Sequence, residues 1–280
     1  MHLTLGHSPD PDDAFMFYAL AANKIDTRGY TFEHILQDIE VLNQRAGRLE
    51  LDITAFSIHA YAYLTDKYAL LPCGASMGDN YGPRLVAKKA YDRKDLTKLR
   101  IAVPGLRTSA FLALMLYLNK GEKELNLVVT PFDQIFSALH AGKADVGLLI
   151  HEGQLTYQQE GLLLLEDLGQ WWFGETNGLP LPLGGNGIRR DLGIEKHREL
   201  NALLKESIQY GLAHRQEAVA HSLPYGRGLD TKLADEFIGM YVNDITVDYG
   251  ERGRAGIREF LTRASNAGFI PADIRIEFVK

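Results

Sequence analysis

The stretch that decides the fold is Ala144-Asp145-Val146-Gly147-Leu148-Leu149-Ile150-His151-Glu152-Gly153. Its apolar part, Val146 to Ile150, has the length and composition of a strand that is buried on both faces of a parallel sheet. Residues that follow the carboxyl end of such a strand face the crevice where open α/β sheets bind ligands. The sequence therefore predicts that His151 lies at the edge of a binding cleft.

His151 is the candidate catalytic residue, because histidine is the side chain best suited to accept a proton near neutral pH. A single histidine after a strand is also commonly a hydrogen-bonded structural residue. Its position alone does not separate the two roles, so the surrounding residues have to decide.

Composition narrows the classes of protein to which the chain can belong. Its 280 residues are enough for about two domains, and the proportions of hydrophobic (46%) and charged (24%) residues are ordinary for a globular enzyme. The net charge of −6 and the absence of a long basic run argue against a nucleic-acid partner. No apolar stretch is long enough to span a bilayer, so we expect no membrane partner.

The single cysteine and the N-terminal sequence indicate the cellular compartment of the protein. Cys73 has no partner for an internal disulfide, which fits a reducing compartment. The first residues enter a strand at once, without the basic and apolar regions of a signal peptide. Both features predict a cytoplasmic protein.

A first strand near the N-terminus leads into Ser8-Pro9-Asp10-Pro11-Asp12-Asp13 and then into a helix. We expect Asp10 to cap that helix and Pro11 to occupy its first position, with the other acids favoured by the helix dipole. These acids and His7 could alternatively form a metal site, but capping accounts for them more simply, and we predict no metal. Ser8, at the end of the strand, is a candidate substrate contact.

Two further strand-to-helix junctions carry hydroxyl groups. Ser57 follows the strand Asp52 to Phe56, and it either caps the next helix or presents its hydroxyl and neighbouring N–H groups to a ligand. Thr108 and Ser109 precede an apolar helix, where free N–H groups and the positive helix end suit a carboxylate. Simple capping competes with anion binding at both junctions.

The order of elements predicts two lobes. A new strand–helix unit begins near residue 99, and residues 180–188 form an extended return segment. We therefore expect a larger α/β lobe from residues 1–98 plus 188–280 and a smaller α/β lobe from residues 99–187. Helical periodicity over 194–213, 233–242 and 252–267 completes the larger lobe. This α/β arrangement, with two lobes joined by two crossovers, is similar to the type II periplasmic-binding-protein fold.

A set of motifs resembles one family of the futalosine route to menaquinone, which holds 1,4-dihydroxy-6-naphthoate synthase and chorismate dehydratase. The motifs are Ser8-Pro9-Asp10-Pro11-Asp12-Asp13, Val103-Pro104-Gly105 with Thr108, Ile150-His151-Glu152 with Thr156-Tyr157, and Gly178-Leu179-Pro180-Leu181-Pro182-Leu183-Gly184. The resemblance is closer to the synthase, because the dehydratase lacks the Ile-His-Glu motif. Other members often have Cys and Asn where this chain has Asp10 and Asp12.

The resemblance implies a carbon–carbon lyase that converts cyclic dehypoxanthine futalosine to 1,4-dihydroxy-6-naphthoate, with loss of a sugar-derived fragment. It implies no metal or redox cofactor, a small aromatic carboxylate as substrate, and His151 as the proton acceptor. The substrate contacts that it implies or that strand ends suggest are Ser8, Ala55, Phe56, Ser57, Thr108 and Ser109.

Two other functions stay open at this point. One is chorismate dehydratase, and the other is a non-catalytic solute-binding protein, against which the missing signal peptide argues. The sequence also leaves open the oligomeric state, the closure of the lobes, the roles of Glu152 and Cys73, and whether Asp10 and Asp12 alter the substrate.

Overall fold

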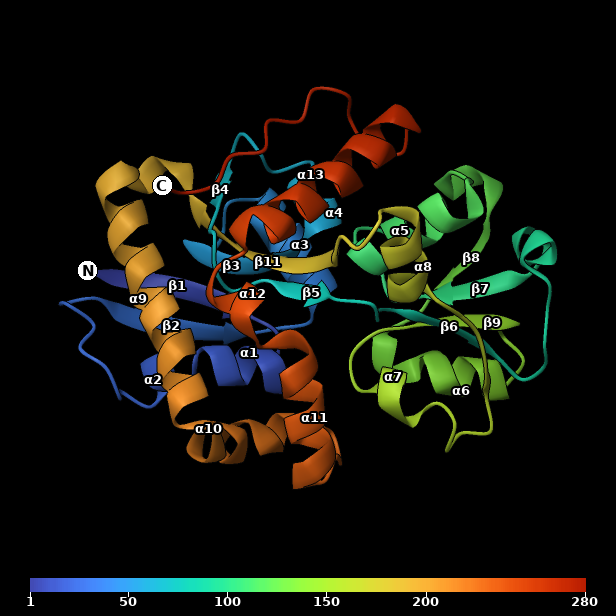
Figure 1. Ribbon diagram of the computed structural model, residues 1–280, viewed down its shortest axis with the longest axis horizontal. Coiled ribbons are helices and arrows are strands. Elements are labelled where there is room, and N and C mark those ends of the chain that lie inside the picture. Colours follow the sequence, from blue (N-terminus) through green and yellow to red (C-terminus); the bar gives the residue numbers. More distant parts are fainter.

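The larger of the two β-sheets is built from the first five strands of the chain and the last one. The computed structural model describes residues 1–280, and Figure 1 shows them as two lobes side by side. The first sheet has the strand order β2-β1-β3-β11-β4, and β5 pairs with the outer part of β11. Its strands are β1 (His2–His7), β2 (Thr31–Leu36), β3 (Ile53–Ser57), β4 (Tyr68–Leu70), β5 (Ser76–Gly78) and β11 (Leu181–Arg189).

The smaller sheet carries the strand that precedes His151. Its order is β10-β6-β9-β7-β8, with β9 at the centre. The strands are β6 (Arg84–Ala87), β7 (Arg100–Val103), β8 (Asn126–Val129), β9 (Val146–Leu149) and β10 (Leu163–Asp167). The prediction of a buried strand before His151 is confirmed, since all four residues of β9 are buried.

The sheet around β9 is mixed, whereas the sequence predicted a parallel one. β9 runs parallel to β7 but antiparallel to β6. Apolar runs report burial on both faces and do not report the direction of a neighbouring strand.

Helices cover both faces of the smaller sheet (Figure 1). α5 (Ser109–Leu118) packs on one face, in a cluster that includes Leu85 and Val146, and α6 (Ile135–His140) packs on the other. Gly147 allows α6 to lie directly on β9, because an added Cβ would lie 2.7 Å from Ile135 Cγ2. The strand that presents His151 is therefore fixed from both sides.

The remaining helices flank the cavity or complete the larger lobe. They are α1 (Pro11–Met16), α2 (Tyr18–Ala21), α3 (Ile39–Gly47), α4 (Ile58–Tyr61), α7 (Gly153–Thr156), α8 (Leu168–Glu175), α9 (Ile194–Ala213), α10 (Arg215–Ser222), α11 (Thr231–Tyr241), α12 (Asp244–Val247) and α13 (Gly250–Asn266). The three predicted C-terminal helices are confirmed as α9, α11 and α13. No helix of the chain is both long and apolar enough to cross a membrane.

The predicted lobe boundaries differ from the sheets. The chain passes to the smaller sheet between β5 and β6, at residues 79–83, and returns between β10 and β11, at residues 168–180. The predicted smaller lobe, 99–187, omitted β6 and included most of β11. β6 pairs with β9 and β10, which lie far along the chain, so no local pattern could assign it to that sheet.

The first of these crossings, at residues 79–83, packs closely against the start of α8. An added Cβ on Gly169 would lie 1.9 Å from the carbonyl oxygen of Tyr81, which is backbone and cannot move aside. Gly174, in the same helix, has nothing within 4 Å of its added Cβ.

We expect Gly169→Ala to lower the free energy of unfolding by about 1–3 kcal/mol, because the new methyl group forces the crossing away from the helix. Gly174→Ala is the matched control and should be neutral or stabilising by up to about 1 kcal/mol, since alanine is the better helix former. Urea unfolding of both variants measures the difference, and equal midpoints would contradict the tight approach.

Candidate active site

A cavity of about 720 Å³, partly open to solvent, lies between the two lobes. This volume suits a small organic ligand. Both lobes line it: the turn after β1, the end of β3 and part of β11 on one side, and the start of α5 and the segment after β9 on the other. Of the residues predicted for the site, the cavity brings together Ser8, Ala55, Ser57, Thr108, Ser109 and His151.

Phe56 does not belong with these residues. Successive side chains of a strand point to opposite faces, so Ala55 and Ser57 face the cavity and Phe56 faces away. Its ring is fully buried and stacks on Tyr61, with the ring centroids 5.6 Å apart. The prediction of a substrate contact by the Phe56 side chain is therefore wrong.

His151 enters the cavity from the smaller lobe. Its backbone is left-handed (φ 55°), a conformation that is uncommon outside glycine and that costs about 1–2 kcal/mol for most residues. The side chain is only 15% exposed, and its ring lies edge-on to Phe132 at 4.5 Å between centroids. Nδ1 lies 3.0 Å from Asp10 Oδ2, while Nε2 is buried without a hydrogen-bond partner.

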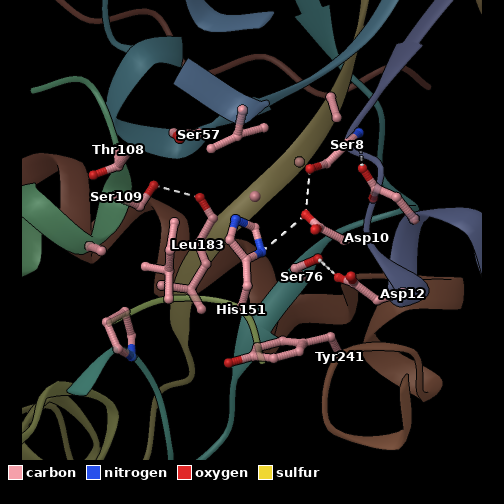
Figure 2. Close-up of a pocket in the computed structure, with 18 of the residues that line it drawn as sticks. Ser8, Asp10, Asp12, Ser57, Ser76, Thr108, Ser109, His151, Leu183 and Tyr241 are labelled. Atoms are coloured by element: carbon pink, nitrogen blue, oxygen red, sulfur yellow. Dashed lines mark hydrogen bonds and ion pairs between the residues drawn. The ribbon is translucent and has the colours of Figure 1, made fainter. Parts of the chain in front are cut away.

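Asp10 belongs to the larger lobe, so its contact with His151 joins the two lobes (Figure 2). Ser8 Oγ donates to Asp10 Oδ2, and Arg227 Nη1 lies 2.7 Å from Oδ1. Asp10 does occupy the position before α1, but its side chain makes no capping hydrogen bond. The prediction that it caps the helix is wrong, because these three partners occupy its carboxylate.

Arg227 links this pair to Glu152. Its Nη1 lies 3.1 Å from Glu152 Oε2, and its guanidinium lies over the Phe132 ring, 4.5 Å from the centroid. Glu152 thus holds the arginine that neutralises Asp10. No local pattern marks Arg227, because it lies 217 residues from Asp10, in a turn before α11.

Two more buried carboxylates follow Asp10. Burial, reinforced by the charge of Asp10, raises the pKa of Asp12 to about 6, and Ser76 Oγ donates to its Oδ2 at 3.2 Å. Burial also raises the pKa of Asp13 well above its usual range, although Ser8 N donates to Asp13 Oδ2 at 2.6 Å. No group of three His, Cys, Asp or Glu side chains is arranged to hold a metal ion.

The opposite side of the cavity is formed by the start of α5. Thr108 caps this helix, accepting from Phe111 N at 3.2 Å and donating to Gly105 O at 2.9 Å. The Ser109 hydroxyl donates to Leu183 O and accepts from His59 N. Both hydroxyls are therefore engaged, and the groups left for an anion are the first backbone amides of the helix, at Ser109 and Ala110.

Ser57 keeps a free hydroxyl proton. It makes no capping hydrogen bond, so the capping alternative is wrong. Instead its N–H donates to Asn43 Oδ1 at 2.8 Å, and its Oγ accepts from Asn43 Nδ2 at 3.1 Å. Since Asn43 supplies the donor, the Ser57 O–H can point into the cavity. Asn43 was not predicted as a site residue, and its burial on α3 becomes visible only in the structure.

Another contact between the lobes was also missed. Tyr241, from α11, donates its hydroxyl to Gln154 Oε1 at 2.9 Å, and both residues line the cavity. The sequence around Tyr241 is an ordinary amphipathic helix, in which nothing distinguishes this position.

Relatives of known structure share this fold. A crystal structure from Archaeoglobus fulgidus has a TM-score of 0.90 at 44% identity, covering 96% of this chain and 98% of that one. The alkanesulfonate-binding protein SsuA from Xanthomonas axonopodis pv. citri has a TM-score of 0.70 at 13% identity, covering 98% and 96% of the two chains. The second likeness concerns the fold alone, and it confirms the predicted two-lobed periplasmic-binding-protein architecture.

Relatives in sequence give the family. The chain is 36% identical to 1,4-dihydroxy-6-naphthoate synthase of Streptomyces coelicolor, over 96% of this chain and 95% of that protein. It is also 36% identical to the enzyme of the same name from Thermus thermophilus, over 99% of each chain. A family model described as menaquinone biosynthesis matches residues 3–266. The chain belongs to this menaquinone-biosynthesis family.

Proposed function

We propose that the protein is a lyase that converts cyclic dehypoxanthine futalosine to 1,4-dihydroxy-6-naphthoate in menaquinone biosynthesis. The full-length similarity to two synthases of that name supports this activity. The observation that carries the chemistry is His151, which lines the cavity with Nδ1 held by Asp10 and with Nε2 buried but without a hydrogen-bond partner. The single, unpaired Cys73 supports a reducing, cytoplasmic location.

His151 is the proton acceptor in this proposal. A carboxylate at Nδ1 favours the tautomer that carries its proton there, which leaves the lone pair on Nε2 for a substrate proton. The same carboxylate then stabilises the imidazolium that forms. Asp10 acts through His151 and is a positioning residue.

The proposed reaction breaks one O–H bond and one carbon–carbon bond of the substrate. Nε2 takes the proton of a hydroxyl on the sugar-derived fragment, and the O–H electron pair forms a carbonyl in that fragment. The carbon–carbon bond to the ring breaks, and its electron pair enters the ring, which becomes aromatic. The imidazolium then returns the proton to the ring system. Aromatisation supplies the driving force.

The substrate carboxylate is placed at the start of α5. The amides of Ser109 and Ala110 and the hydroxyl of Ser57 offer donors to an anion, and the helix dipole favours negative charge there. Ala55 contributes a small apolar wall beside it. Ser8 serves the site through its hydrogen bond to Asp10.

We expect His151→Asn to lower kcat by about 100-fold or more while the affinity for the naphthoate product changes little, because general-base catalysis contributes about 10²–10⁴-fold. Asparagine tolerates the left-handed backbone of this position. Turnover is followed by the appearance of naphthoate from the cyclic futalosine.

His140→Asn is the matched control, since His140 is half exposed on α6 and pairs with Glu160 outside the cavity. It should turn over like the wild type. Wild-type turnover by His151→Asn would remove the base from the mechanism, and dehydration of chorismate without naphthoate formation would overturn the proposed activity itself.

Asp10→Asn should lower kcat by about 10- to 100-fold with a smaller change in KM, the range expected for losing one charge-assisted hydrogen bond. Nitrogen-15 NMR of the His151 ring should show a single Nδ1–H tautomer in the wild type and a mixture in the variant. Unchanged kcat together with an unchanged tautomer would show that Asp10 has only a structural role.

A further inference from the structure

The two ends of the cavity differ in charge. At one end Asp10, Asp12 and Asp13 gather around the start of α1, and at the other the lining consists of uncharged hydroxyls and backbone amides at the start of α5. Figure 2 shows His151 between these two groups. The cavity lining contains no lysine or arginine, and the Arg227 guanidinium near the acidic end is already paired with Asp10 and Glu152.

Asp12 and Asp13 both lack a cationic partner, but Asp13 already accepts a hydrogen bond from Ser8 N. Asp10 is neutralised by Arg227, whereas no ion pair involves Asp12 and Ser76 is the only side chain that hydrogen-bonds it. Asp12 is nevertheless 8% exposed and lines the cavity. A buried carboxylate in this position gains most from further hydrogen-bond donors.

A substrate that carries both a carboxylate and a hydroxylated fragment has one favourable orientation here. Its anion would be repelled by the carboxylates at the acidic end and attracted by the helix start at the other. Its hydroxyl groups would supply Asp12 with donors. Since His151 lies between the two ends, this orientation places the bond between the ring and the hydroxylated fragment next to the His151 side chain.

We infer that Asp12, held by Ser76, forms a subsite for the hydroxyl groups of the sugar-derived fragment, and so sets the orientation in which the substrate binds. This inference rests on the proposed function. It assigns the two ends of the cavity to two parts of one ligand, because the product keeps the carboxylate and lacks the hydroxylated fragment.

Asp12→Asn is expected to fold, and its stability reports the burial of this carboxyl. Burial raises the pKa of Asp12 in the folded chain to about 6, from a usual value near 4. Ionisation of this carboxyl therefore makes the fold less stable as the pH rises from about 4 to about 6. The amide of the Asp12→Asn variant does not ionise, so the variant does not lose this stability. Thermal unfolding should therefore show a larger gain in Tm over the wild type at pH 7.5 than at pH 4, and an equal or reversed difference would contradict it.

The decisive experiment compares two probes, the cyclic futalosine substrate and the naphthoate product. Asp12→Asn should weaken substrate binding about 10-fold, measured as KM and as Kd in the inactive His151→Asn background, and leave the Kd of the naphthoate within about 2-fold. Ser57→Ala is the comparison variant. It should weaken both probes alike, because both carry the carboxylate.

Equal weakening of both probes by Asp12→Asn, or no weakening of either, would overturn the subsite. Ser76→Ala is the second variant, which leaves the carboxylate in place but removes the hydroxyl that orients it; it should also weaken the substrate more than the naphthoate. Failure of the proposed function has a different signature, since the wild type would then form no naphthoate from the cyclic futalosine at all.

Discussion

The contact between His151 Nδ1 and Asp10 Oδ2, at 3.0 Å, is the interaction on which the site depends. His151 is carried by the smaller lobe and Asp10 by the larger one, so the contact exists only while the lobes meet across the cavity. Arg227 reinforces it by contacting both Asp10 and Glu152, one residue from each lobe. One network of side chains therefore joins the two lobes, orients the His151 ring and neutralises the buried Asp10 carboxylate.

The fold makes this network possible by holding each partner on a rigid element. β9 is buried between two neighbouring strands and covered by α6, while Asp10 lies where β1 turns into α1. SsuA shares this architecture at only 13% identity, so the likeness concerns the fold and not what the chain does. Function on such a scaffold resides in the side chains that the cleft collects, and here these are a histidine between an acidic end and a helix start.

Local sequence was sufficient for features with a local cause. The apolar run before His151 and the periodicity of α9 predicted what the structure contains, and capping by Thr108 was one of the two alternatives that its position allowed. Local patterns failed where a partner lies far along the chain. Asp10 followed by Pro11 looks like a helix cap, yet its carboxylate pairs with Arg227, 217 residues away.

The same division holds for the candidate site as a whole. The sequence by itself determined that His151 follows a buried strand and that hydroxyl residues begin the helices beside it, because burial and capping are set by residues within a few positions. The tertiary structure alone decided that Phe56 faces the core, that β6 joins the smaller sheet, and that three carboxylates share one end of a cavity with a single guanidinium nearby. Which face of a strand is buried, which strands pair and which charges are neutralised depend on the distant segments that meet when the chain folds.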